Sequence, residues 1–241
     1  MLPAQSISPV TNMMGRDEVQ SVVHDLRSPI AVIKGNLQLL LSGVMGQMTS
    51  EQLLLIKRSV DPLEDLILLT DNLLQSTSLE KDLEMKHEAT DLDKVLSETI
   101  DFYADAFRQR EMELIRDGNT VGKVLNIETL WMKRVLNNLI WNAYKFTPDH
   151  GRVVIQVELV ADGLNVIISD NGRGIPAAKM QNLFQKNVQS TKANDGKIGT
   201  GLGLWICKRV LELHGASIRA ESLEGKGSRF ILHFPARCIL K

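Results

Sequence analysis

The sequence predicts an α+β protein: an antiparallel helical hairpin that forms a dimeric four-helix bundle, followed by an α/β sandwich of two layers. In the first third of the chain, apolar residues recur at alternating steps of three and four, which is the spacing of packed helices. From about residue 85, short alternating runs typical of strands mix with helical patterns without regular β-α alternation, which favours a two-layer sandwich over a doubly wound sheet. The 241 residues, 44% of them hydrophobic, can bury the core of one large domain or two modest ones.

The first predicted helix carries an apolar seam that extends over more than three heptads. Its residues are Val19, Val23, Leu26, Ile30, Ile33, Leu37, Leu40 and Val44. Gly43 and Gly46 interrupt the pattern, and residues 49–52, Thr-Ser-Glu-Gln, provide the start of a second helix. The second seam consists of Leu53, Ile56, Val60, Leu63, Ile67, Thr70 and Leu74. Two long helices joined by a short turn make an antiparallel hairpin.

One hairpin cannot enclose both seams along a helix about 40 Å long at 1.5 Å per residue. We therefore expect a second copy of the chain to complete a four-helix bundle. Pro29 and Pro62 lie inside the predicted helices, and each removes a backbone hydrogen bond. Because the seams continue past both prolines, we expect local kinks and not helix ends.

The second domain is predicted from strands at 152–160 and 164–169 and helices at 92–110, 128–146 and 202–214. Gly151 precedes the first strand and the Asp162-Gly163 pair separates the two strands, which predicts a hairpin. Residues 76–88 are polar and charged, as in a linker. We therefore expect an N-terminal tail at 1–14, the helical hairpin at 15–82 and the sandwich domain at 86–237.

Composition excludes several classes of function. The net charge of -1 provides no excess of positive charge for binding nucleic acid or an anionic membrane. Two cysteines, Cys207 and Cys238, do not make a disulfide framework or a metal site in a chain of this length. No apolar run approaches the roughly 18 residues that cross a bilayer. We expect a cytoplasmic location, although such a piece could be the cytosolic portion of a membrane-bound sensor.

His24 lies in the stretch His24-Asp25-Leu26-Arg27-Ser28-Pro29, one position after a seam residue. An imidazole at that place flanks the core and can titrate. Asp25 could accept the proton of Nδ1, which would leave Nε2 as a nucleophile. A solvated histidine beside an aspartate is also common on helix surfaces, so the motif alone leaves both interpretations open.

Asn138, Asn142 and Lys145 share one face of a predicted helix. Amide oxygens suit a hard cation such as Mg²⁺ and an ammonium suits a phosphate oxygen, so this face could hold a metal and a triphosphate. The alternative is a polar outer face.

Two glycine clusters, 170–176 and 199–204, precede predicted helices and would let backbone N–H groups approach phosphate. Ordinary turns are the alternative, and neither cluster fits a P-loop or a Rossmann motif.

Taken in order, these motifs resemble those of the sensor histidine kinase family of two-component signalling, over roughly residues 15–235. Residues 24–29 resemble the phospho-acceptor H-box, 138–146 the N-box, 170–176 the G1 box, 199–204 the G2 box and 225–230 the last glycine turn. The resemblance implies a Bergerat-type domain that binds ATP and Mg²⁺. It also implies a homodimer and a response regulator as partners.

The resemblance assigns roles to individual residues. Asp170 would accept a hydrogen bond from the adenine amino group, Asn142 would ligate Mg²⁺ with help from Asn138, and Lys145 would contact phosphate. The glycines would shape the pocket and the hinges of a lid over 177–198. The implied nucleotide-binding residues are Asn138, Asn142, Lys145, Asp170, Gly172, Gly174, Gly199, Thr200, Gly201, Leu202, Gly203 and Ser228.

The implied activity is transfer of the γ-phosphoryl group from ATP to His24 and then to an aspartate of a response regulator, with Asp25 and Ser28 in supporting roles. Phe184 is followed three residues later by Asn187, where the family commonly has a second phenylalanine, so lid closure could differ. Ser28 stands where many relatives have Thr or Asn, and we expect weak phosphatase activity. A regulatory scaffold with little activity and a phosphatase-dominant member remain as rivals.

Other conspicuous residues receive structural interpretations. Trp131, Trp141 and Trp205 lie on predicted helices and are expected to pack. The remaining histidines show no metal-ligand spacing, and we expect them to be solvated or singly hydrogen-bonded. They are His87, His150, His214 and His233.

Overall fold

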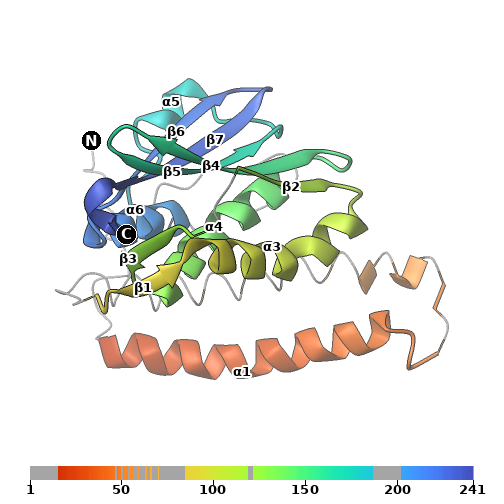
Figure 1. The fold of residues 1–241 in the computed structure, drawn as a ribbon. Coiled ribbons are helices and arrows are strands. Elements are labelled where there is room, and N and C mark those ends of the chain that lie inside the picture. The colour runs from red at the N-terminus through yellow and green to blue at the C-terminus, as the bar shows by residue number, and fades with distance from the viewer. Residues whose placement is uncertain are drawn as a thin grey trace, which may run out of the picture. The chain divides into compact units, whose positions relative to one another are not determined.

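The computed structural model in Figure 1 consists of two compact units. The first unit holds the described residues between 16 and 70, and the second holds those between 85 and 240. The residues that the structure describes are 16–46, 48–49, 51–53, 55–56, 59, 63, 66, 70, 85–118, 122–186 and 202–240. Within these residues, no helix has the length and apolar character needed to cross a membrane.

The first unit begins with helix α1, Arg16–Leu41, which continues through Pro29 as predicted. Seam residues Val23 and Ile30 are buried. Leu26 and Ile33, on the same seam, are 45% and 49% exposed in the single chain. The seam of α1 is therefore only partly covered within one copy.

A second helix follows α1 after a turn at Gly43 and Gly46, both of which have positive φ. Thr49 and Gln52 form the predicted capping box: the Thr49 amide donates to Gln52 Oε1 at 2.9 Å, and the Gln52 amide donates to Thr49 Oγ1 at 3.2 Å. The described residues from 51 to 70 are helical. The predicted kink at Pro62 lies outside the described residues.

The second unit is a two-layer sandwich, as predicted. A five-stranded sheet has the order β2-β4-β5-β7-β6, in which β2 and β4 are parallel and the other neighbours antiparallel. Helices α3, α4 and α6 cover one face of this sheet, and the short helix α5 lies near β6 (Figure 1). The strands are β2 (Glu113–Asp117), β4 (Arg152–Val160), β5 (Gly163–Asp170), β6 (Ser217–Leu223) and β7 (Gly227–Pro235). The helices are α3 (Leu92–Gln109), α4 (Thr129–Phe146), α5 (Ala177–Met180) and α6 (Gly203–Leu213).

The observed bounds of β4, β5, α3, α4 and α6 lie within one residue of the predicted ranges, and β4 and β5 form the predicted hairpin. A second sheet of three short strands was not predicted. It has the order β1-β3-β8, formed by Glu88–Asp91, Val124–Ile127 and Ile239–Leu240, and a 3-10 turn η2 (Ala236–Cys238) precedes β8. The last strand of the chain therefore pairs with a strand more than 110 residues earlier.

The core lies between the five-stranded sheet and the helices. Trp131 and Trp141 are buried in it, which confirms their predicted packing role, whereas Trp205 is half-buried. The largest fully buried side chains include Phe107, Leu136, Leu139, Ile140, Ile155 and Phe234. Burial of this apolar surface fixes α4 against β4 and β5.

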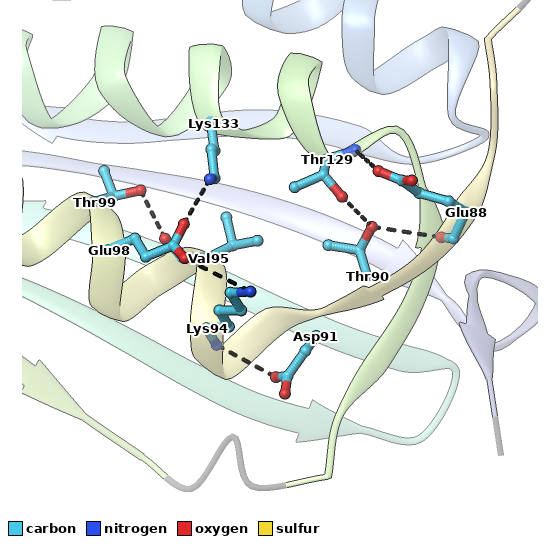
Figure 2. Close-up of polar contacts among 9 residues, drawn as sticks. All are labelled: Glu88, Thr90, Asp91, Lys94, Val95, Glu98, Thr99, Thr129 and Lys133. Atoms are coloured by element: carbon cyan, nitrogen blue, oxygen red, sulfur yellow. Dashed lines mark hydrogen bonds and ion pairs between the residues drawn. The ribbon is translucent and has the colours of Figure 1, made fainter.

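Polar contacts at the small sheet anchor the starts of α3 and α4 (Figure 2). Asp91 caps α3 by accepting from the backbone N–H groups of Asp93 and Lys94 at 2.9 and 3.3 Å. The hydroxyls of Thr90 and Thr129 lie 2.7 Å apart and join β1 to the first turn of α4. These contacts fix where α4 begins, and α4 carries three of the candidate site residues.

His214 corrects our expectation of a solvated or singly hydrogen-bonded ring. Its side chain is only 3% exposed, its Nδ1 lies 2.7 Å from the carbonyl oxygen of Val210, and its Nε2 accepts the backbone N–H of Glu128 at 3.0 Å. This pair of contacts requires a neutral ring with its proton on Nδ1. His214 therefore joins the end of α6 to the start of α4. Burial lowers the pKa of its imidazole from about 6.5.

Lowering the pH from 7.5 to 5.5 should reduce the free energy of unfolding by about 1 kcal/mol through His214. The unfolded chain binds a proton near pH 6.5 that the native ring does not take up until the pH falls through its lowered pKa. Urea denaturation at both pH values measures the effect. His214→Gln should be less stable at pH 7.5 and lose most of the pH dependence, whereas the exposed His150, as His150→Gln, should retain it. Equal pH dependence in parent and His214→Gln would contradict the assignment.

Candidate active site

The face of α4 that carries Asn138, Asn142 and Lys145 is not a solvated outer face. Asn138 and Lys145 are only 3% and 8% exposed, and Asn142 is half-buried. The alternative interpretation of these residues is therefore wrong. A buried face with two amides and an ammonium can bind an anionic ligand with directed hydrogen bonds.

Arg110 holds the C-terminal end of α4. Its guanidinium donates to the carbonyl oxygens of Tyr144 and Thr147 at 2.5 and 2.8 Å, and to Asp149 Oδ1 at 2.6 Å. The guanidinium also lies 4.7 Å from the centre of the Tyr144 ring. Carbonyl groups at a helix end lack partners within the helix, so a cation there stabilises the last turn. Sequence analysis missed this residue, because an arginine just after a helix carries no local signal of such contacts.

The end of α4 supports the glycine turn that follows β5. The backbone N–H of Arg173 donates to the carbonyl oxygen of Phe146 at 3.2 Å. A Cβ at Gly172 would lie 2.4 Å from that same oxygen, so only glycine fits there. The Arg173 guanidinium lies 4.3 Å from the centre of the Phe146 ring. One peptide oxygen therefore joins the segment 138–146 to the segment 170–174.

Gly174 needs glycine for two reasons. Its φ is +69°, and a Cβ would lie 2.1 Å from the carbonyl oxygen of Leu223 at the end of β6. The Gly225 amide donates to the carbonyl oxygen of Arg173 at 2.7 Å, which brings the β6–β7 turn against the same segment. The two predicted glycine turns, at 170–176 and 225–230, are therefore neighbours in space.

Asp170, the last residue of β5, is the carboxylate on which these turns converge. Its Oδ1 accepts the backbone N–H of Gly172 at 2.9 Å and that of Ser228 at 3.2 Å. Burial raises the pKa of this carboxyl, while the two N–H groups act in the opposite direction. Within the described part of the chain both hydrogen bonds reach Oδ1, so Oδ2 can accept from a ligand.

The remaining candidate residues are only partly described. Leu202 is buried immediately before α6, and Gly203 begins that helix. Gly199, Thr200 and Gly201 lie outside the described residues, as does Asn187 in the expected lid.

On α1, Asp25 and Ser28 are exposed. His24 lies within the helix, and its side chain is outside the described residues.

Comparisons with known proteins match both units. Residues 15–82 match the family described as His Kinase A (phospho-acceptor) domain. Residues 128–237 match the family described as Histidine kinase-, DNA gyrase B-, and HSP90-like ATPase.

The sensor protein kinase PmrB of Pseudomonas aeruginosa is 34% identical over 218 residues, which cover 88% of this chain and 44% of that protein. The sensor histidine kinase WalK of Bacillus subtilis is 29% identical over 225 residues, which cover 91% of this chain and 36% of that protein. The chain thus spans less than half the length of these relatives.

Solved structures share the fold. Full-length ShkA in complex with AMPPNP has a TM-score of 0.65 and 20% sequence identity, and the match covers 92% of this chain and 47% of that one. The catalytic domain of the histidine kinase ThkA has a TM-score of 0.55 and 24% identity, and the match covers 63% of this chain and 96% of that one.

Proposed function

Because the chain belongs to the sensor histidine kinase family of two-component signalling, with a phospho-acceptor domain followed by an ATPase domain, we propose that it autophosphorylates on His24 with the γ-phosphoryl group of ATP. The observation that carries the proposal is the Asp170 carboxylate, which is held by two backbone N–H groups beside the end of α4. The full-length ShkA structure, which shares this fold, was solved in complex with AMPPNP, an adenine nucleotide analogue.

The adenine end of the nucleotide lies at Asp170. A carboxylate whose Oδ1 is saturated by protein donors presents Oδ2 to the amino group of adenine, and this donor–acceptor pairing favours adenine over a base with an oxo group there. Gly172 keeps the turn close to the end of α4, Gly174 keeps it close to β6, and Ser228 lies across from Asp170 on β7. The family resemblance also assigns Leu202 and Gly203, at the start of α6, to the nucleotide site.

The phosphate end lies along α4. Lys145 pairs with phosphate oxygens, and Asn142, with Asn138 one turn earlier, offers amide oxygens to Mg²⁺. Amide and phosphate oxygens are a donor set that suits Mg²⁺. When bound, Mg²⁺ supplies neutralisation of phosphate charge.

The phospho-acceptor is His24 on α1. Nε2 donates its lone pair to the γ-phosphorus while the bond from that phosphorus to the bridging oxygen breaks, and ADP leaves with the electron pair. Asp25 accepts the proton of Nδ1. An aspartate of a response regulator then takes the phosphoryl group, as the N–P bond breaks and an O–P bond forms.

A second copy of the chain is the partner of the helical unit. Leu26 and Ile33 lie on the seam of α1 and are about half exposed in one copy, whereas Val23 and Ile30 are buried. Covering the exposed half with the same seam of a second copy completes a four-helix bundle and removes this apolar surface from water.

Ser28 lies four residues after His24, about one helical turn along the same face, and it is exposed. A serine hydroxyl can hold a water for the reverse reaction on the phosphorylated regulator, but it is shorter than Asn and has more rotamers than Thr. Since a misplacement of about 1 Å can cost on the order of 10²-fold in rate, the phosphatase activity is weak.

Incubation with γ-labelled ATP and Mg²⁺ tests the proposal. The protein should acquire label that is lost in acid and retained in alkali, because a phosphoramidate is acid-labile, and the label should move to a receiver domain on mixing. Absence of label with intact ATP binding would favour the scaffold. Rapid release of phosphate from a phosphorylated regulator, without autophosphorylation, would favour the phosphatase-dominant alternative.

A further inference from the structure

Ser222 on β6 has three partners around one hydroxyl. Its Oγ accepts the backbone N–H of Ile175 at 2.8 Å and donates to the carbonyl oxygen of Gly227, also at 2.8 Å. Ser228 Oγ lies 3.1 Å away and is an alternative acceptor for the single hydrogen. The side chain is half-buried, and sequence analysis assigned it no role.

These partners belong to the two segments that hold Asp170. Ile175 ends the turn whose Gly172 donates to Asp170 Oδ1, and Gly227 precedes Ser228, which donates to the same oxygen. The hydroxyl of Ser222 therefore links, through its hydrogen bonds, the two segments whose N–H groups donate to Asp170.

The strand register places Ser222 in the same row of the sheet as Asp170, with Ser228 between them. Ser222 is opposite Ser228, and Ser228 is opposite Asp170, so the three residues form one row across β6, β7 and β5. Neighbours in such a row project from the same face of a sheet. The buried Phe230 and Ile168 continue this face, which the helices cover.

We infer that Ser222 is a positioning residue for adenine recognition, because it fixes the two N–H donors that orient the Asp170 carboxylate. This inference rests on the proposed function, in which Asp170 accepts from the adenine amino group. Without the hydroxyl, the Ile175 amide and the Gly227 carbonyl each lose a hydrogen-bond partner, and the segments that carry Gly172 and Ser228 are no longer tied together.

The test compares Ser222→Thr with Ser222→Val, which have nearly the same shape and differ by a hydroxyl against a methyl group. Magnesium-free ADP titrated into the full chain should bind about 5- to 30-fold more weakly to Ser222→Val than to Ser222→Thr, because partners of a lost hydrogen bond stay unpaired. Ser222→Ala should behave like Ser222→Val. The exposed Ser217 on the same strand, as Ser217→Ala, should bind ADP like the parent.

Base selectivity separates positioning from general loss of structure. Inosine diphosphate has an oxo group where ADP has the amino group, so its affinity should change little in Ser222→Val and the preference for ADP should fall. As the pH is lowered, the affinity for ADP should also begin to fall at a higher pH in Ser222→Val than in the parent. The reason is that weaker N–H donation raises the pKa of Asp170.

Equal loss of both nucleotides, or equal ADP affinity in the Thr and Val variants, would overturn the inference. If Ser222→Val does not fold, Ser222→Ala decides by the same comparison with Ser222→Thr. Asp170→Ala distinguishes failure of the proposed function from failure of the role of Ser222. If it retains ADP affinity, the proposed function fails. If it loses affinity while Ser222→Val does not, only the role of Ser222 fails.

Discussion

Asp170→Ala should lose affinity for ADP on the order of 10²-fold or more, and the loss should be the same with and without magnesium. The substitution removes the acceptor for the adenine amino group, and it also leaves the N–H groups of Gly172 and Ser228 without their partner. Hydrogen bonds to charged groups contribute about 1.5–3 kcal/mol each, and several are lost together. Titration calorimetry with ADP and with ATP measures the effect.

Asp170→Asn is the sharper variant, because it keeps the size of the side chain. Its single oxygen would stay with the two backbone N–H groups, which puts the amide nitrogen where the ligand needs an acceptor. We expect a loss close to that of Asp170→Ala. Asp162→Ala, an exposed aspartate at the opposite end of β5, is the matched control and should bind normally. Asn142→Ala should weaken only magnesium-dependent steps. Unchanged ADP affinity in Asp170→Asn would show that adenine binds elsewhere.

His24→Gln should abolish the acid-labile label while ADP affinity stays at the level of the parent. The reason is chemical: glutamine has a similar length but no nucleophilic ring nitrogen. Phosphorimaging after incubation with γ-labelled ATP gives the first readout, and calorimetry gives the second. His150→Gln removes an exposed histidine of the second unit and should retain the label.

Replacing the neighbouring Asp25 tests which group takes the proton from His24. Asp25→Asn should slow labelling by about 10²- to 10⁴-fold if the carboxylate takes up the Nδ1 proton. Label that persists in His24→Gln would assign the acceptor to another residue. An unchanged rate in Asp25→Asn would make Asp25 an ordinary surface charge.

The sequence was sufficient for the elements with a strong period and clear punctuation. Strands β4 and β5 alternate over eight or nine residues around a short turn, and α4 repeats apolar residues over five turns, so their bounds were predicted within one residue. Strands β1, β3 and β8 have only two to four residues. A run that short has no measurable period, and its pairing is decided by partners far away in the chain.

The same distinction applies to the site. The capping box and the glycine turns depend on residues close in sequence, and they were visible there. Arg110, Ser222 and His214 act through contacts with residues 34 to 86 positions away. No local pattern encodes such contacts, so a histidine joined to two helices looked like any surface histidine.

The carbonyl oxygen of Phe146 has a consequence for how this site would respond to mutational scanning. Every residue type has this oxygen, so Phe146→Ala would leave the link to the glycine turn intact, and an alanine scan would not reveal it. The link becomes visible only from its other side. Arg173→Pro removes the donated N–H, and Gly172→Ala places a methyl group 2.4 Å from the oxygen. Tolerance to side-chain replacement at 146 therefore says nothing about how much the backbone there matters.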